Sequence, residues 1–149
     1  EIEKLVETTK KEGAKVLMGG KRPAGFNKGF YYEPTVFDEV QDNFTIMKQE
    51  PFGPLVPMLS FKSFDEVIER SNKNDLGLCS YICTNSMDQA HRASELMETG
   101  VVAVNTPVVA IAEAPFGGIK QTGYGREGGS MAIKDYLNIK YTHMGIHYD

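Results

Sequence analysis

Cysteine is the residue type in this chain most able to act as a nucleophile, and it occurs twice, as Cys79 and Cys83. A reactive cysteine needs an exposed, electropositive setting that favours the thiolate. Both lie in an apolar stretch with no Lys, Arg or His between Leu76 and Thr84, so we predict two buried, structural thiols. We therefore expect neither cysteine to be catalytic.

The same pair bears on metals and on the redox compartment. On one strand the two cysteines share a face, too far apart for an easy disulfide. With no histidine nearby in the sequence they supply only half the ligands of a zinc site, so no metal centre is expected. Nothing indicates a disulfide-stapled secreted domain, and the expected location is a reducing compartment, the cytoplasm.

A second candidate is the glycine pattern Gly123-x-Gly125-x-x-Gly128, which matches the dinucleotide-binding fingerprint letter by letter. The fingerprint should follow directly on a strand and lead to an acidic residue about 20 positions later. Here it follows another glycine-rich loop, and the residue at that distance is Tyr148. We interpret these glycines as structural.

A third candidate is the carboxylate of Glu50, which opens the sequence Glu-Pro-Phe-Gly-Pro over residues 50–54. A carboxylate only accepts hydrogen bonds and can hold the hydroxyls of a ribose. By residue type alone, a surface carboxylate before a proline turn is the more ordinary interpretation. The two prolines and the glycine exclude a helix interior or a central strand at this point.

The elements that must position these groups follow from apolar periodicity. Strands are predicted at residues 55–61, 78–84 and 101–104, alternating with helices that begin at the capping boxes Ser63-Phe64-Asp65-Glu66 and Ser86-Met87-Asp88-Gln89. This alternation with short links predicts an α/β fold with a βαβαβ parallel open sheet. Ligands meet such sheets at the carboxyl ends of the strands, and the long glycine-rich loop 105–129 follows the third of them.

The flanks of this unit are shorter elements. A helix is predicted from the first residues, followed by strands at 14–18 and within 31–40, with residues 43–54 irregular; a helix at 131–137 and a strand at 139–146 close the chain. Because the sequence starts inside a helical pattern without a Met, we expect the natural N-terminus to lie upstream.

Composition excludes several classes of function. A chain of 149 residues with 41% hydrophobic and 24% charged residues is typical of a folded domain, not of a disordered or fibrous chain. The net charge is −4 and no basic stripe is present, which argues against a nucleic-acid partner. The longest apolar runs are far too short to span a bilayer, so no membrane partner is expected.

Two stretches resemble the aldehyde dehydrogenase superfamily. They are residues 50–54 and residues 115–127, Pro-Phe-Gly-Gly-Ile-Lys-Gln-Thr-Gly-Tyr-Gly-Arg-Glu, with Asn105, Tyr136 and Lys140 around them. The resemblance implies that residues 1–137 are the C-terminal part of the catalytic, aldehyde-binding domain. It also implies that residues 138–149 are an oligomerisation strand and tail, through which homo-dimers or homo-tetramers form.

The resemblance further implies a chemistry. A cysteine thiolate attacks a small-molecule aldehyde, the adduct passes a hydride to NAD or NADP, and a glutamate activates water to release the acid. In the family both groups lie upstream of the position of Glu1. We therefore expect no catalytic residue in this chain, most of the cofactor site elsewhere, and an inactive isolated chain.

Within the chain, the resemblance assigns five residues. Glu50 is similar to the glutamate that hydrogen-bonds the nicotinamide ribose, and Phe52 to the phenylalanine beside the nicotinamide, although it would otherwise be interpreted as a core aromatic. Ala110, Ile111 and Phe116 fall in the segment that lines the aldehyde pocket; for Phe116 the plain alternative is a loop anchor.

The substrate is less determined than the family. Residues 114–121 and 135–141 particularly resemble succinate-semialdehyde dehydrogenases, which bind the substrate carboxylate partly through a serine in this loop. That position is Ala110, which has no hydroxyl, so a related ω-semialdehyde acid or another aldehyde fits as well. Two alternatives stay open: a member that transfers the acyl group to coenzyme A, and a non-catalytic module for binding or self-association.

Overall fold

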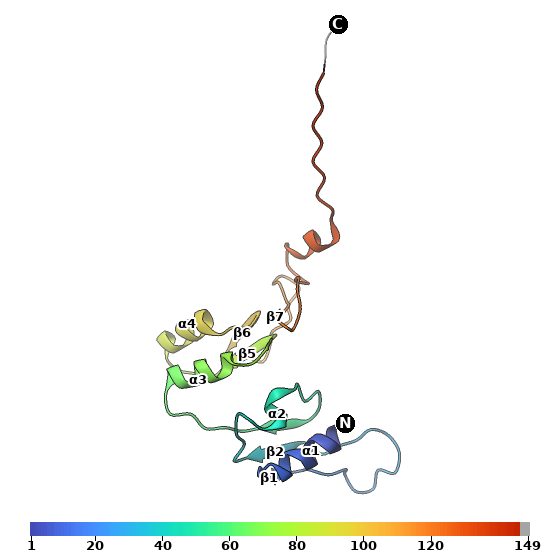
Figure 1. The fold of residues 1–149 in the computed structure, drawn as a ribbon, viewed down its shortest axis with the longest axis vertical. Helices are drawn as coiled ribbons and strands as arrows, with labels where there is room; N and C mark the ends of the chain where they lie inside the picture. The colour runs from blue at the N-terminus through green and yellow to red at the C-terminus, as the bar shows by residue number, and fades with distance from the viewer. Residues whose placement is uncertain (147–149) are drawn as a thin grey trace. The chain divides into compact units, whose positions relative to one another are not determined.

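The computed structural model describes residues 1–146, which divide into two compact units, residues 1–70 and the described residues from 71 on (Figure 1). Each unit combines short helices with short strands, which confirms the α/β class. Within the described residues, no helix is both long and apolar enough to cross a bilayer.

The first unit begins with α1 (Ile2–Lys11). Leu5, Val6 and Thr9 recur at helical spacing and form its buried face. The helix ends where Gly13 takes a φ of 112°, a conformation that favours glycine, and the Gly13 N–H closes the last turn.

Three strands in the order β1 (Lys15–Met18), β2 (Thr35–Asp38) and β3 (Leu55–Pro57) form the sheet of this unit. The β1–β2 pair is antiparallel and the β2–β3 pair is parallel. Phe37 on β2 is fully buried, and Leu55 on β3 is 7% exposed. The core residues come from α1, from β2 and β3, and from the segments that follow α1 and β2; they are Leu5, Val6, Ala14, Phe37, Val40, Phe44, Ile46 and Leu55.

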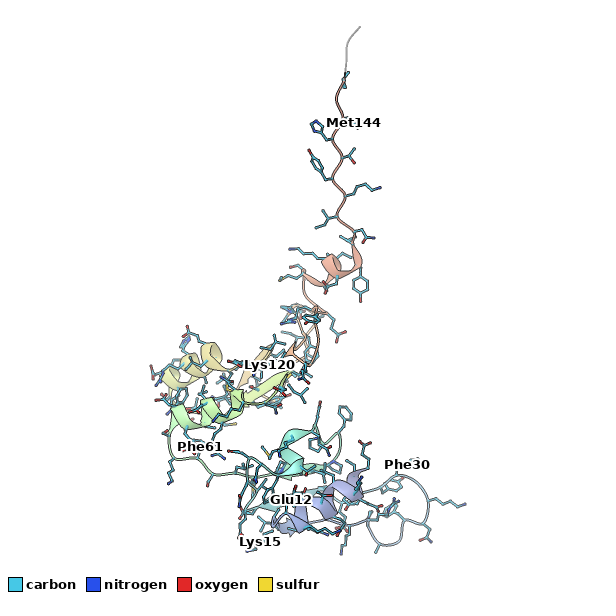
Figure 2. The ribbon with its side chains drawn as sticks, viewed as in Figure 1. Glu12, Lys15, Phe30, Phe61, Lys120 and Met144 are labelled. Carbon is cyan, nitrogen blue, oxygen red and sulfur yellow. The ribbon has the colours of Figure 1, made fainter. Side chains whose placement is uncertain are left out.

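A short helix, α2 (Thr45–Lys48), lies in the stretch that the sequence predicted as irregular. The carboxylate of Glu12, labelled in Figure 2, accepts hydrogen bonds from Thr45 N at 3.0 and 3.1 Å and from Thr45 Oγ1 at 2.6 Å. Because this cap comes from the end of α1, the local sequence around Thr45 could not reveal it.

The helix α3 (Phe64–Asn72) begins at the predicted capping box. Ser63 Oγ accepts from Glu66 N at 3.2 Å, but Glu66 Oε2 accepts from Lys62 N at 2.8 Å rather than from Ser63. The Lys62 N–H is the main cause that lowers the pKa of Glu66. Within the first unit, Arg70 then bonds α3 to the turn after β2, with Nε and Nη2 at 2.9 and 3.0 Å from the two Asp42 carboxylate oxygens.

The second unit contains the predicted strand–helix–strand motif. It consists of β5 (Cys79–Ile82), α4 (Met87–Leu96) and β6 (Val101–Val104), and the two strands are parallel from Cys79 opposite Val101 to Ile82 opposite Val104. Ser86 caps α4 by accepting from Gln89 N at 3.3 Å, as its sequence predicted.

Two elements of the second unit were not predicted, β4 (Leu76–Gly77) and β7 (Ile119–Lys120), which form an antiparallel pair. Each has only two residues, too few for a periodic pattern. The pairing depends on the return of the loop after β6, which only the tertiary structure specifies.

The structure corrects the predicted βαβαβ sheet. Only β5 and β6 form the expected parallel pair, whereas β3 hydrogen-bonds with β2 in the first unit. The predicted strand at 55–61 is reduced to Leu55–Pro57. The buried side chain of Leu55 belongs to the core that Phe37 and α1 form, and the last hydrogen bond to β2 is from Met58 N to Phe37 O at 2.9 Å.

The end of the chain also differs from expectation. The helix predicted at 131–137 is the 3-10 helix η1 (Ala132–Tyr136). No strand is assigned to residues 139–146 in this single chain, and their side chains are exposed, including Ile139 at 101% and Met144 at 81% (Figure 2). Residues 147–149 of the predicted tail lie outside the described residues.

Candidate functional site

The carboxyl ends of β5 and β6 are joined by Asn105, at the edge where parallel sheets receive ligands. Its N–H donates to Ile82 O at 2.8 Å, its Oδ1 accepts from Thr84 N at 3.0 Å, and its Nδ2 donates to Thr84 O at 2.8 Å. Asn105 has a φ of 55°, which turns the chain out of the sheet. Asparagine tolerates this conformation better than most residues.

The loop that leaves Asn105 carries three of the predicted site residues. Ala110 is exposed, Ile111 is 52% exposed, and Phe116 is half-buried. Phe116 exchanges two backbone hydrogen bonds with Glu127, at 2.7 and 2.8 Å, so its position is set by a ladder as well as by its ring. The loop therefore offers a mainly apolar surface beside the sheet edge.

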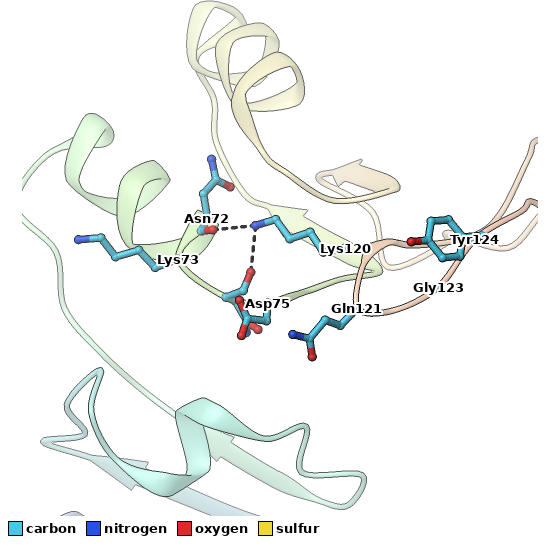
Figure 3. Close-up of a pocket in the computed structure, with 8 residues that line it drawn as sticks. Asn72, Lys73, Asp75, Lys120, Gln121, Gly123 and Tyr124 are labelled. Carbon is cyan, nitrogen blue, oxygen red and sulfur yellow. Dashed lines mark hydrogen bonds between the residues drawn. The ribbon is translucent and has the colours of Figure 1, made fainter.

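The following segment is held by Lys120, shown in Figure 3. Its Nζ donates to Asn72 O at 2.7 Å and to Asn74 O at 2.9 Å, and lies 2.6 Å from Glu98 Oε2. The ammonium group thus satisfies carbonyl groups at and just after the end of α3, where a cation is favoured. Asn72, Asn74 and Lys120 also line a shallow hollow with Asp75, Gln121 and Tyr124.

Further contacts fix the same segment. Thr122 Oγ1 accepts from Gly77 N at 2.8 Å, and Arg126 Nη1 donates to Gly118 O at 2.8 Å. Gly117 passes so close to Gly100 that a Cβ at position 100 would lie 1.8 Å from Gly117 O. Thr122 and Arg126 are structural supports, and Gly100 leaves room for the segment; no local sequence pattern indicated these roles.

The glycine pattern at 123, 125 and 128 is accounted for by backbone conformation. All three residues have positive φ, of 126°, 82° and 72°. A Cβ at Gly128 would also lie 2.7 Å from Ala114 O. These glycines allow the backbone conformation of the loop, which supports their interpretation as structural.

In the first unit, Glu50 and Phe52 lie in the irregular stretch before β3. Phe52 N donates to Glu50 O at 3.0 Å, which folds the backbone into a tight turn. The Phe52 side chain is 92% exposed, so it is not a core aromatic of this unit, and Glu50 is exposed as well. These two residues belong to the first unit, whereas Ala110, Ile111 and Phe116 belong to the second.

The cysteines differ from each other. Cys79 on β5 is half-buried, and burial raises the pKa of its thiol. A hydrogen bond with Tyr81 lowers this pKa, but its effect is smaller than that of burial. Cys83 is exposed, which corrects its predicted burial: β5 ends at Ile82, so Cys83 lies beyond the strand. Among the described residues, no three His, Cys, Asp or Glu side chains are grouped to hold a metal ion.

Comparison with known proteins gives a family. A sequence model of the aldehyde dehydrogenase family matches residues 1–142. Human retinaldehyde dehydrogenase 3 is 45% identical over 93% of this chain and 27% of its own length. Mitochondrial succinate-semialdehyde dehydrogenase of Arabidopsis thaliana is 41% identical over 97% of this chain and 27% of its own length.

A solved structure agrees with these relatives. The NAD⁺ complex of aldehyde dehydrogenase from Bacillus cereus superposes with a TM-score of 0.89 at 42% identity, over 93% of this chain and 28% of that one. The chain thus spans less than a third of the length of the proteins it matches. With the family model matching nearly its whole length, the chain belongs to the aldehyde dehydrogenase family.

Proposed function

We propose that residues 1–137 form the C-terminal part of the catalytic domain of an NAD(P)-dependent aldehyde dehydrogenase, with an oligomerisation strand and tail at 138–149. The family match over residues 1–142 carries this proposal. The TM-score of 0.89 to a solved family member supports it. In this arrangement the nucleophilic cysteine, the general-base glutamate and most of the cofactor site belong to other parts of the enzyme.

The isolated chain is then inactive. A catalytic nucleophile alone is worth on the order of 10⁶ in rate in a serine protease, and here the general base is absent as well. The test is a nicotinamide-reduction assay on the purified 149-residue chain with several aldehydes. Robust aldehyde-dependent reduction would show that the chain carries its own catalytic groups and would refute this part of the proposal.

Glu50 and Phe52 form one edge of the nicotinamide site in this proposal. The exposed carboxylate of Glu50 holds the ribose hydroxyls, and the exposed ring of Phe52 packs beside the nicotinamide. An aromatic side chain that is 92% exposed is supported as a ligand contact because burying it on binding removes apolar area from water.

A matched pair of variants tests this edge in the enzyme that contains the chain. Glu50→Gln should raise the KM for the cofactor about tenfold or more, since a hydrogen bond to a charged group is worth about 1.5–3 kcal/mol. Glu39→Gln, at another exposed carboxylate of the same unit, should leave that KM unchanged. Equal KM values for both variants would remove Glu50 from the cofactor site.

The substrate of the enzyme is a small carboxylated aldehyde, succinate semialdehyde or a related ω-semialdehyde acid. The likeness to a succinate-semialdehyde dehydrogenase at 41% identity supports this class. Ala110 lies exposed on the proposed wall and offers no hydroxyl to a carboxylate, so the carboxylate contacts come from other parts of the enzyme. A screen of semialdehyde acids against neutral aldehydes decides the class, and a strong preference for neutral aldehydes would refute it.

The enzyme acts in the cytoplasm in this proposal. Residues 138–149 join its subunits into a homo-dimer or homo-tetramer. The exposed Ile139, Tyr141 and Ile146, at 101%, 84% and 73%, support an interface at this segment. Deleting residues 138–149 from the enzyme should reduce its mass in solution to that of a smaller assembly. An unchanged assembly would mean that the interface lies elsewhere.

A further inference from the structure

We propose that Asn105 is the positioning residue of the proposed pocket loop: its side-chain amide continues the β5–β6 ladder by one rung and thereby sets where residues 106–111 lie. The functional half of this inference rests on the proposed function. The structural half can be tested on the chain by itself.

The geometry at Asn105 resembles strand pairing carried out by a side chain. The backbone of Asn105 turns away at a φ of 55° after its N–H has made the last rung with Ile82 O. Its primary amide then offers the donor and acceptor that the next peptide group would have offered, and it bonds both backbone groups of Thr84, at 3.0 and 2.8 Å. The ladder is completed although the chain has already left the sheet.

Thr84 is itself held from the other side. Its Oγ1 donates to Gln89 Oε1 at 2.9 Å and accepts from Ser86 N at 3.1 Å, at the start of α4. Asn105 is therefore bonded to a backbone that the helix terminus already fixes. A side chain bonded to a fixed partner can hold its own loop in place, whereas one bonded to a free chain end could not.

The loop needs such an anchor because little else holds its first half. Among the described residues, the non-local hydrogen bonds of residues 105–116 occur near the two ends of this stretch: those of Asn105 at the start, then Ala112 O, which accepts from Gly129 N at 2.8 Å, and Phe116 with Glu127. Between them, Val108 is 61% and Ile111 52% exposed. A shift at Asn105 therefore moves Ala110 and Ile111.

The structural test uses Asn105→Asp, which keeps the size and tolerates the left-handed backbone. The ionised carboxylate still accepts from Thr84 N but opposes Thr84 O, because it has no donor. We expect the NMR order parameters of residues 106–111 in the chain to fall towards the flexible range, below about 0.6. Asn74→Ala is the matched control, since Asn74 Oδ1 accepts a similar bond from Leu76 N at 2.9 Å, outside this loop.

Protonation provides a rescue that a general loss of stability would not. A protonated carboxyl again has one donor and one acceptor, so in the Asn105→Asp variant the order of residues 106–111 should recover as the pH falls through the titration of the introduced carboxyl. If the variant does not fold, Asn105→Gly, which also accepts the positive φ but has no amide, replaces it. Order parameters equal to wild type in the folded variant would overturn the inference.

The functional test is made in the enzyme that contains the chain. Misplacing a pocket wall by about 1 Å costs on the order of 100-fold in kcat/KM, so Asn105→Asp should lower kcat/KM unequally for aldehydes of different size, with the cofactor KM unchanged. An equal loss for all aldehydes would make Asn105 a stability residue and refute its positioning role. Inactivity of the wild-type enzyme towards every aldehyde would instead refute the proposed function, while the order parameters still decide the structural half.

Discussion

The glycine-rich loop after β6 has two halves that are held in opposite ways. Residues 106–111 are mostly exposed and depend on an anchor at each end, whereas residues 117–127 are fixed by Lys120, Thr122 and Arg126. Within one loop, the structure thus places a lightly held surface next to a heavily braced one. The difference indicates that the first half can change its residues at small cost in stability, while the second cannot.

The largest loss of stability is expected at Gly100, directly before β6, where the braced half of the loop passes closest. Gly100→Ala would place a Cβ 1.8 Å from Gly117 O, and because both groups belong to the backbone, neither can move cheaply. Overpacking of this kind costs about 3 kcal/mol of unfolding free energy, measurable by urea denaturation. Gly145→Ala, where a Cβ meets nothing within 4 Å, is the control and should cost little.

Removal of the ammonium of Lys120 should have the next largest effect. Lys120→Met leaves the carbonyl of the half-buried Asn72 without its donor, and an unsatisfied group of this kind costs about 1–3 kcal/mol, whereas the exposed Asn74 O can bond water instead. Lys140→Met, at an exposed lysine of the same unit, is the matched control in the same denaturation assay. A loss for Lys120→Met no greater than that of the control would show that the brace contributes nothing.

A single hydrogen bond of the braced half is tested by Thr122→Val, which keeps the shape of the side chain. Gly77 N then loses the Oγ1 acceptor that lies at 2.8 Å. We expect a loss of about 1 kcal/mol in thermal unfolding. Thr106→Val, whose Oγ1 accepts only a local bond from Val108 N at 3.1 Å, should cost less. The reverse order would contradict the division of the loop into two halves.

The smallest effect on stability is expected in the lightly held half. Ala110→Ser changes an exposed position, so the unfolding free energy should stay within about 0.5 kcal/mol. In the enzyme that contains the chain, the new hydroxyl can donate to a substrate carboxylate, and kcat/KM for semialdehyde acids relative to neutral aldehydes should rise about tenfold. An unchanged ratio would mean that position 110 does not face the substrate.

Elements that are marked by their own residues, through a capping box or an apolar run, were predicted from the sequence. The capping serines, Ser63 and Ser86, begin α3 and α4 as expected, and β6 spans the predicted residues 101–104. Elements that depend on contacts with residues distant in the sequence were missed. The short helix α2 is capped by the distant Glu12, and β4 and β7 pair with each other although β5, α4 and β6 lie between them in the sequence.

The site shows the same division. The candidate residues at 50, 52, 110, 111 and 116 came from the resemblance to the aldehyde dehydrogenase superfamily, and their roles stay proposals. The supporting side chains were not found, because an ordinary asparagine, lysine or threonine in a loop carries no signal of its partner. Asn105 and Lys120 belong to the positions that carry the family resemblance, but their supporting roles become visible only through positive φ angles of 55° and 57° and through bonds to residues far away in the sequence.

The sequence by itself determined the family, the α/β class and the starts of α3 and α4, because these depend on residue types at short, fixed spacings. Only the tertiary structure decided that β3 pairs with β2, that Cys83 is exposed, and that Asn105 bonds Thr84. Those outcomes depend on which distant groups compete for the same hydrogen bonds and the same buried space. In the loop after β6, that competition is what separates the lightly held half from the braced one.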